Sequence, residues 1–210
     1  MNLRTVFSGL AAVLLLCMAA FAADGSALKP PAGARVAVVV FEDLECPSCA
    51  RAYPVVWETA NAHHVPVVLR DFPLAIHHWS MEAAIFARYF DTKSQKLGNE
   101  FRGYIYQNQP NITPENLRQY VQKFADDAKV PLPFVLDSDG KLKEKVLADR
   151  TMGEKAGLVH TPTIFVIGNG VPFVEVQEPD KLGEIIEDMQ KKAGAPAAAK
   201  KVRFHKKTTR

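Results

Sequence analysis

The sequence contains little cysteine, and this scarcity excludes several classes of protein. Only three cysteines occur among the 210 residues, at Cys17, Cys46 and Cys49. A small scaffold held together by many disulfides is therefore excluded. The rest of the composition is ordinary, with 48% hydrophobic and 23% charged residues, so the chain is neither fibrous nor disordered as a whole. Its length suits one globular domain with additional segments.

The N-terminus lacks the basic cluster that would stop transfer through a membrane. Arg4 precedes an apolar run that ends in small residues at Ala20 and Ala22, which is the layout of a secretory signal peptide. We therefore predict a signal peptide over residues 1–22. An uncleaved anchor is the alternative, because the apolar stretch approaches the roughly 20 residues of a spanning helix. In both cases the body of the protein is expected outside the cytoplasm, in the periplasm or an equivalent compartment.

Without the signal peptide, the chain has no third cysteine to pair with Cys46 or Cys49. A disulfide between these two closes a loop of only about four residues, which stabilises a fold by roughly 2 kcal/mol. A chain of this length can bury a core without that contribution. A purely structural disulfide is therefore a poor explanation for the pair.

The sequence also lacks the usual partners of a zinc site. Structural zinc sites combine a first pair of cysteines with a second Cys-x-x-Cys or a His-x3-His, and neither occurs here. The adjacent histidines at 63–64 and 77–78 do not have the spacing that places two imidazoles on one helix face. We expect no metal site, and copper bound by Cys46, Cys49 and one distant histidine remains the alternative.

Local sequence around the two cysteines favours redox chemistry. The valine-rich run from Arg35 to Phe41 predicts a strand buried on both faces of a sheet. Pro47 suits the first position of a helix, which places Cys46 at the helix N-terminus. There the helix dipole and unpaired N–H groups favour a thiolate and lower the thiol pKa. Cys46 is then the attacking sulfur, and Cys49, one turn inside, is the resolving thiol.

The segment from Phe41 to Pro54 resembles the active-site segment of the DsbA-like family of thioredoxin-fold thiol–disulfide oxidoreductases, which are secreted bacterial proteins. The matching residues are Phe41, Asp43, Cys46, Pro47, Ser48, Cys49 and Pro54. The resemblance gives Asp43, Pro47, Ser48 and Pro54 supporting roles around the two cysteines. It also implies that Pro54 kinks the active-site helix.

A second match lies in the C-terminal half, at "GLVHTPTIFVIGNG". This stretch is similar to the family's hairpin, and Thr161 and Pro162 occupy the position of its cis-proline. The resemblance implies that the Thr161–Pro162 loop faces the cysteines and binds the backbone of an extended substrate. The strand is expected over Thr163–Ile167, followed by a turn at residues 168–170 and a second strand.

The resemblance implies an α/β fold, thioredoxin-like over residues 30–192, with a helical insertion at about 75–157 between its βαβ and ββα halves. Residues 65–74 predict a second strand, and helical periodicity is present in residues 80–90, 113–130 and 138–157. The second of these helices is expected to begin with Thr113 as its cap. A final helix is expected to begin near Pro179.

The sequence departs from the family in its acidic residues. Family members often carry a buried acid six residues before the first cysteine, which helps to move protons to and from the resolving thiol; here that residue is Val40. Glu42, Asp43 or Glu45 could substitute for it. We nevertheless expect at least two of these three to be solvated, and clustered carboxylates to oppose a thiolate at Cys46.

A second departure concerns the residue before Cys49. Ser48 stands where the strong oxidants of the family carry a histidine, whose imidazolium can stabilise the thiolate. We therefore predict a couple that is less oxidising than those of the strongest family members.

Charge is distributed unevenly along the chain. Residues 23–190 carry 17 basic and 23 acidic residues, a net charge of about −6, whereas the last 20 residues carry eight basic residues and no acid. We predict a disordered basic tail over residues 193–210 that could contact an anionic surface such as lipid. Nucleic acid is not an expected partner of an exported chain.

These observations predict an extracytoplasmic enzyme that forms or exchanges disulfides in exported, unfolded polypeptides through Cys46 and Cys49. No cofactor is expected apart from the redox-active Cys46–Cys49 disulfide. A membrane redox partner is expected, and the protein is expected to be monomeric because residues 23–33 are too few for a dimerisation region. A reductase or isomerase of the same fold is one alternative, and a non-enzymatic copper-binding protein or chaperone is the other.

Overall fold

The computed structural model describes residues 28–194, so the predicted signal peptide and residues 195–210 of the predicted tail lie outside the described residues. A four-stranded sheet in the order β2-β1-β3-β4 forms its centre. The strands are β1 (Val36–Glu42), β2 (Val67–Asp71), β3 (Thr163–Gly168) and β4 (Val171–Glu175). β1 is parallel to β2 and antiparallel to β3, and β3 is antiparallel to β4.

The valine-rich run forms the central strand because both of its faces are covered. All seven residues of β1 are buried. Alternate residues from Val36 to Val40 pack against α2 (Pro47–Ala62) and α7 (Leu182–Gly194). The intervening residues from Ala37 to Phe41 face the opposite side, beside the end of α6 (Lys141–Lys155). The expectation of a strand buried on both faces is confirmed.

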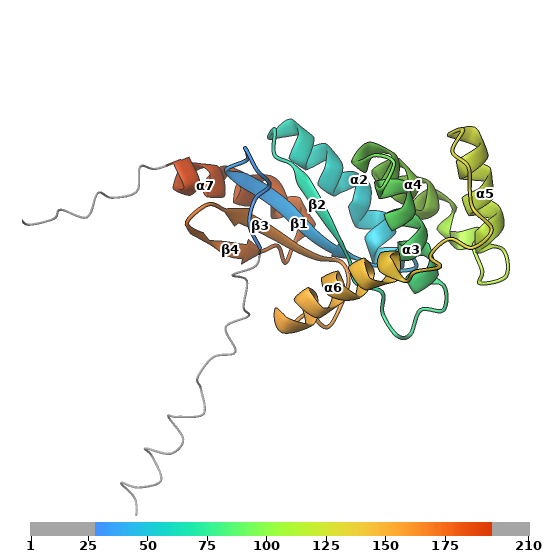
Figure 1. Cartoon of the computed structure of the whole chain (residues 1–210). Coiled ribbons are helices and arrows are strands. Elements are labelled where there is room, and N and C mark those ends of the chain that lie inside the picture. The colour runs from blue at the N-terminus through green and yellow to red at the C-terminus, as the bar shows by residue number, and fades with distance from the viewer. Residues whose placement is uncertain (1–27, 195–210) are drawn as a thin grey trace, which may run out of the picture.

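Four helices stand between β2 and β3, as the predicted fold class requires. They are α3 (Ser80–Asp91), α4 (Gln95–Asn108), α5 (Leu117–Asp127) and α6, with a short 3-10 turn, η1 (Gln109–Asn111), after α4. Figure 1 shows α3, α4 and α5 grouped at one end of the molecule, with α7 toward the other end. The α/β thioredoxin-like fold with a helical insertion is confirmed.

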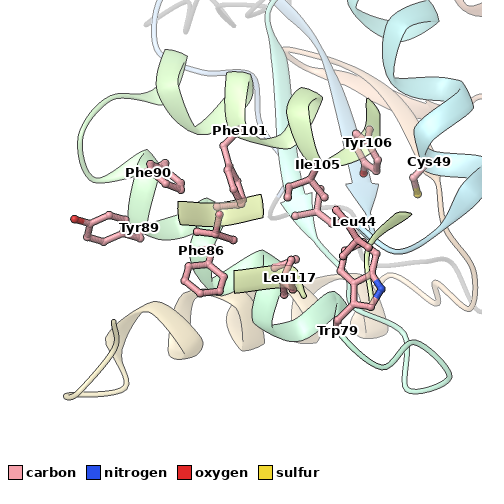
Figure 2. Packing of buried hydrophobic residues seen from close by; sticks show 14 of the residues in the cluster. Leu44, Cys49, Trp79, Phe86, Tyr89, Phe90, Phe101, Ile105, Tyr106 and Leu117 are labelled. Carbon is pink, nitrogen blue, oxygen red and sulfur yellow. The ribbon is translucent and has the colours of Figure 1, made fainter. Parts of the chain in front are cut away.

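The inserted helices enclose an aromatic core of their own. The core includes Phe86 and Phe90 from α3, Phe101 and Ile105 from α4, and Leu117 and Val121 from α5. Cys46 and Cys49 belong to the same buried cluster. Figure 2 shows the Cys49 sulfur at its edge, on the side of Tyr106. The insertion therefore packs directly against the segment that carries the two cysteines.

Two boundaries in the insertion differ from the sequence prediction. The helix expected to begin with Thr113 as its cap begins at Leu117, because residues 113–116 form a turn in which the Asn116 side chain accepts the Thr113 N–H at 2.7 Å. α4 lies between two of the predicted segments and was not distinguished as a separate helix. Within residues 28–194, no helix is both long enough and apolar enough to cross a bilayer.

Candidate active site

The two cysteines lie where β1 gives way to α2. Cys46 is the last extended residue before the helix, with φ −78° and ψ 118°, and Pro47 occupies the first turn. The Cys46 carbonyl accepts the N–H of Ala50 at 3.2 Å, which starts the helical bonding. The Cys46 side chain makes no capping hydrogen bond, so its sulfur stays available at the positive end of the helix.

The Cys46 sulfur is held next to the second half of the sheet. It lies 3.4 Å from the carbonyl oxygen of Thr161, and the Thr161–Pro162 peptide bond is cis, as the resemblance implied. A hydrogen bond from the Cys49 thiol lowers the pKa of Cys46 to about 5, helped by the side chain of Thr161 and by the N–H groups of Cys49 and Ser48, while burial opposes the shift. The sulfur is therefore ionised at neutral pH.

Cys49 is kept as a neutral thiol. Its side chain is buried, and the N–H of Asp43 donates to its sulfur at 3.5 Å. Burial raises the pKa of Cys49 far above its ordinary value, and the adjacent Cys46 sulfur raises it further. Both cysteines are unpaired, so the structure describes the dithiol form. A thiolate at the start of the helix beside a neutral thiol is the division of roles that disulfide exchange requires.

Two of the residues predicted to support the site, Ser48 and Pro54, lie in α2. Ser48 accepts a hydrogen bond from the Arg51 guanidinium at 2.8 Å, on the exposed side of the helix start. Pro54 lies inside α2, which continues through it to Ala62. Without an N–H, Pro54 cannot bond the carbonyl of Ala50.

The expectation that at least two of the nearby carboxylates are solvated was wrong. Glu42 and Asp43 are 3% and 2% exposed, and the side chain of Glu45 is 17% exposed. The sequence suggested solvation because three acids in four residues cannot normally be buried without partners. The partners come from other segments of the chain. Hydrogen bonds, not these carboxylates, dominate the pKa of Cys46.

Asp43 and Glu45 tie the site to the segment after β2. Asp43 accepts the N–H of Glu45 at 2.8 Å and the N–H of Leu74 at 2.7 Å, and it lies 2.7 Å from His77 Nδ1. The carboxylate of Glu45 accepts the N–H groups at the start of α3, from Trp79 and Ser80. The carboxylates of Asp43 and Glu45 therefore hold the segment after β2 and the start of α3 next to the active-site loop.

Glu42 has a different environment, inside a buried group of charges. Tyr106 donates to its Oε2 at 2.9 Å, and Arg102 Nε lies 3.1 Å from its Oε1. Arg102 also pairs with Asp91 and reaches Asp71. Burial raises the pKa of Glu42 to about 7, against the opposing charge of Arg102.

Sequence reasoning missed Gln109 as part of the site. Its side-chain amide donates to the carbonyl of Leu44 at 2.8 Å and to that of Cys46 at 3.2 Å, which fixes the loop before α2. No local pattern marks this residue, because the contact spans more than sixty positions. Only its place in the short turn after α4 gives it that role.

A surface groove runs past the cis-proline. Its volume is about 460 Å³, and it is lined by residues of the start of α2, the cis-proline loop and the end of β4. The lining includes Ser48, Arg51, His160, Pro162 and Glu175. A groove of this kind beside a reactive sulfur can hold an extended polypeptide. Within the described part of the chain, no group of three or more histidine, cysteine or acidic side chains is arranged to hold a metal ion.

Comparison with known proteins assigns this architecture. The sequence model described as thioredoxin matches residues 31–188, which is more than half of the chain. Among curated protein sequences, none matches significantly.

Solved structures share the fold at low sequence identity. α-DsbA1 of Wolbachia pipientis aligns with a TM-score of 0.63 and 17% identity, covering 78% of this chain and 90% of its own. A linker-deletion mutant of ScsC from Proteus mirabilis gives 0.65 and 15%, covering 90% and 92%. A periplasmic thioredoxin-like protein from Salmonella enterica gives 0.61 and 16%, covering 77% and 87%. These likenesses establish a fold of the DsbA and ScsC type.

Proposed function

Because this chain belongs to the thioredoxin family, we propose that it is a protein thiol–disulfide oxidoreductase that works outside the cytoplasm through Cys46 and Cys49. The main support for this proposal is the environment of the Cys46 sulfur. It stands at the N-terminus of α2 with a pKa lowered to about 5, 3.4 Å from the Thr161 carbonyl. An ionised sulfur beside a loop that can bind backbone is suited to exchange with polypeptide disulfides.

The proposed reaction begins with the Cys46–Cys49 disulfide. A substrate thiolate attacks the Cys46 sulfur, the bond to Cys49 breaks, and Cys49 leaves as a thiolate that takes up one proton. A second substrate thiolate then attacks the substrate sulfur of the mixed disulfide and releases Cys46 as a stable thiolate. Two electrons pass from substrate to enzyme, and the second substrate proton goes to solvent.

The lowered Cys46 pKa favours the oxidising direction. A stable Cys46 thiolate stabilises the dithiol form, which raises the tendency of the disulfide form to accept electrons. Ser48 provides no imidazolium, so we retain the prediction of a couple milder than those of the strongest oxidants of this kind. A reductase or isomerase is the alternative direction for the same chemistry.

The proposed extracytoplasmic setting is supported by the sequence of the N-terminal segment and by one structural neighbour. The signal-like N-terminus and a structural neighbour described as periplasmic support an extracytoplasmic location. Unfolded exported polypeptides are the proposed substrates, and a membrane protein is the proposed redox partner. We propose a monomer whose basic tail can contact an anionic surface.

Oxidative folding of a reduced, unfolded ribonuclease-like protein tests the proposal. The purified disulfide form should restore activity to that substrate faster than glutathione buffer alone. Cys46→Ser should abolish this activity, whereas Cys49→Ala, oxidised at Cys46 by glutathione disulfide in the buffer, should accumulate mixed disulfides with the substrate. If Cys46→Ser restored activity to the substrate as fast as the wild type does, the proposal would be contradicted.

The in vivo redox state of the two thiols then decides the direction. A protein found mainly as the disulfide is an oxidant, and a protein found mainly as the dithiol is a reductase or isomerase. Alkylation of whole cells after acid quenching measures this state directly.

A further inference from the structure

The turn after β2 points one of two adjacent histidines toward the active-site loop. The N–H of His77 donates to the Leu74 carbonyl at 3.1 Å, which closes the turn. Ile76 is 76% exposed and the side chain of His78 is 81% exposed, whereas only 17% of the His77 side chain is exposed. Of the two histidines, His77 is therefore the one that reaches the interior.

The His77 ring contacts a carboxylate that is shielded from solvent. Its Nδ1 lies 2.7 Å from Asp43 Oδ2, and the side chain of Asp43 is fully buried. The other hydrogen bonds to this carboxylate come from the backbone N–H groups of Glu45 and Leu74. Among the residues that the structure describes, His77 is thus the one side chain that pairs with Asp43.

The chemistry of the pair fixes the direction of its hydrogen bond. An ionised carboxylate only accepts hydrogen bonds, so His77 must donate through a proton on Nδ1. Burial raises the pKa of Asp43, and the hydrogen bonds from Leu74 and His77 lower it. Without the ring, a buried carboxylate would lose a donor that offsets the cost of its burial. His77 therefore favours the charged form of Asp43 and holds it in one position.

The backbone of Asp43 contacts both cysteines. Its carbonyl accepts the N–H of Cys46 at 3.0 Å, and its N–H donates to the Cys49 sulfur at 3.5 Å. Burial raises the pKa of Cys49 far above its ordinary value, and this N–H opposes the rise. The carboxylate and the N–H belong to one residue, so a shift of the carboxylate also moves the donor to Cys49.

We propose that His77 is a positioning residue for the attack of Cys49 on the mixed disulfide. It holds the Asp43 carboxylate and thereby keeps the Asp43 N–H directed at the Cys49 sulfur, where negative charge develops. The inference rests on the proposed function, because it concerns one step of that exchange. His77 contacts Asp43 and acts through it.

The assisted step exchanges one disulfide bond for another. Cys49 gives its proton to solvent, and the resulting thiolate attacks the Cys46 sulfur. The Cys46–Cys49 bond forms as the bond between Cys46 and the substrate sulfur breaks, and the substrate leaves as a thiolate that takes up a proton. Over both steps, two electrons pass from the enzyme to the substrate. In the oxidising direction the same N–H stabilises Cys49 as the leaving thiolate.

The test separates the Cys49 step from the step before it. Reduced full-length protein is mixed with glutathione disulfide at pH 7, and acid-quenched samples are analysed by mass spectrometry. Formation of the Cys46–glutathione adduct reports attack by Cys46, and its decay reports attack by Cys49. In His77→Leu the decay should slow about three- to tenfold, as expected for one misaligned hydrogen bond, and adduct formation should stay within about twofold of the wild type.

Two matched variants distinguish this role from a general loss of stability. Asparagine can place an amide N–H near the position of the Nδ1 proton, so His77→Asn should restore the decay rate to within about twofold of the wild type. His78→Leu removes the neighbouring ring, which lies 4.0 Å from Glu45 Oε1, beyond hydrogen-bonding distance, and should leave both rates unchanged. A variant that is only less stable would show neither the selective slowing nor the rescue.

A measurement on the wild type does not depend on the folding of any variant. Nitrogen NMR of the histidine rings in the reduced protein at pH 7 should show a proton on Nδ1 of His77. A bare Nδ1 would overturn the inference, as would a wild-type decay rate in His77→Leu, a failure of His77→Asn to restore the rate, or equal slowing in His78→Leu. If the wild type formed no adduct at Cys46, the proposed function itself would fail instead.

Discussion

At the scale of single residues, the difference between the two thiols is the central feature. Cys46 and Cys49 belong to one turn of helix, yet their pKa values move in opposite directions. Cys46 benefits from the donors at the helix N-terminus, whereas Cys49 lies beneath the surface with a single backbone donor, Asp43. Two cysteines only three positions apart thus differ in protonation, with Cys46 a thiolate and Cys49 a thiol.

Titration of the Cys46 thiolate tests this difference. The ultraviolet absorbance of the reduced protein should show one thiolate with a midpoint near pH 5. Cys49→Ala removes the main hydrogen bond to Cys46, so the midpoint should move to higher pH. Rates of iodoacetamide alkylation should follow the same curve, and Cys46→Ser provides the blank. A midpoint near the ordinary value of 9.0 would show that Cys46 is an unactivated thiol.

At the scale of secondary-structure elements, the insertion is joined to the sheet by buried charge. Arg102 of α4 is completely buried and contacts carboxylates of β1, β2 and α3. Arg88 of α3 adds ion pairs with Asp71 and with Asp149 of α6. Five elements, β1, β2, α3, α4 and α6, therefore meet around two guanidinium groups.

Arg102→Met should destabilise the protein by roughly 3–5 kcal/mol at pH 7, because it leaves buried carboxylates without their partner. Denaturant unfolding measures this loss. The loss should shrink as the pH falls, since burial raises the pKa of Glu42 to about 7 and its protonation removes its unpaired charge. Lys96→Met, which breaks an exposed pair with Glu100 on the same helix, should change stability by no more than about 0.5 kcal/mol.

Close packing of α6 against the sheet depends on Gly153. A Cβ at this position would lie 2.7 Å from the ring of Phe72 and 3.1 Å from that of Phe41. Both rings are buried. Gly153→Ala gains about 1 kcal/mol of helix propensity but overpacks the core at a cost of roughly 1–3 kcal/mol.

The expected net result for Gly153→Ala is a loss of about 1 kcal/mol in unfolding free energy. Thermal unfolding compared with Thr151→Ala, an exposed position on the same helix, provides the check. Thr151→Ala should be neutral or slightly stabilising. A stabilised Gly153→Ala variant would mean that the two phenylalanine rings have room to move aside.

At the scale of the whole molecule, local patterns predicted the elements but not the contacts between them. The run before Cys46 predicted β1 to within one residue at each end, Pro47 predicted the start of α2, and the valine pattern predicted that β1 is buried on both faces. The burial of Glu42 depends on Arg102, sixty residues away, and no period in the sequence signals such a pair. The hydrogen bond from Gln109 to the active-site loop was not predicted for the same reason, because it joins residues far apart in the sequence.

The balance between the dithiol and disulfide forms links the site to global stability. The pKa of Cys46 is depressed from 9.0 to about 5 only in the folded dithiol form. A depressed pKa contributes stability that is complete above the unfolded value and is lost as the pH falls through the folded value. The disulfide form has no such group. The stability difference between the forms must therefore depend on pH between about 9 and 5.

We predict that lowering the pH from 9 to 5 destabilises the dithiol form relative to the disulfide form. Urea unfolding of both forms across this range measures the difference. The disulfide brings a pH-independent gain of roughly 2 kcal/mol from its short loop, which shifts the offset but not the slope. The pH dependence of the stability difference between the two forms therefore reports the titration of the Cys46 sulfur. A pH-independent difference would show that folding does not stabilise the thiolate, and the oxidising direction would lose its thermodynamic basis.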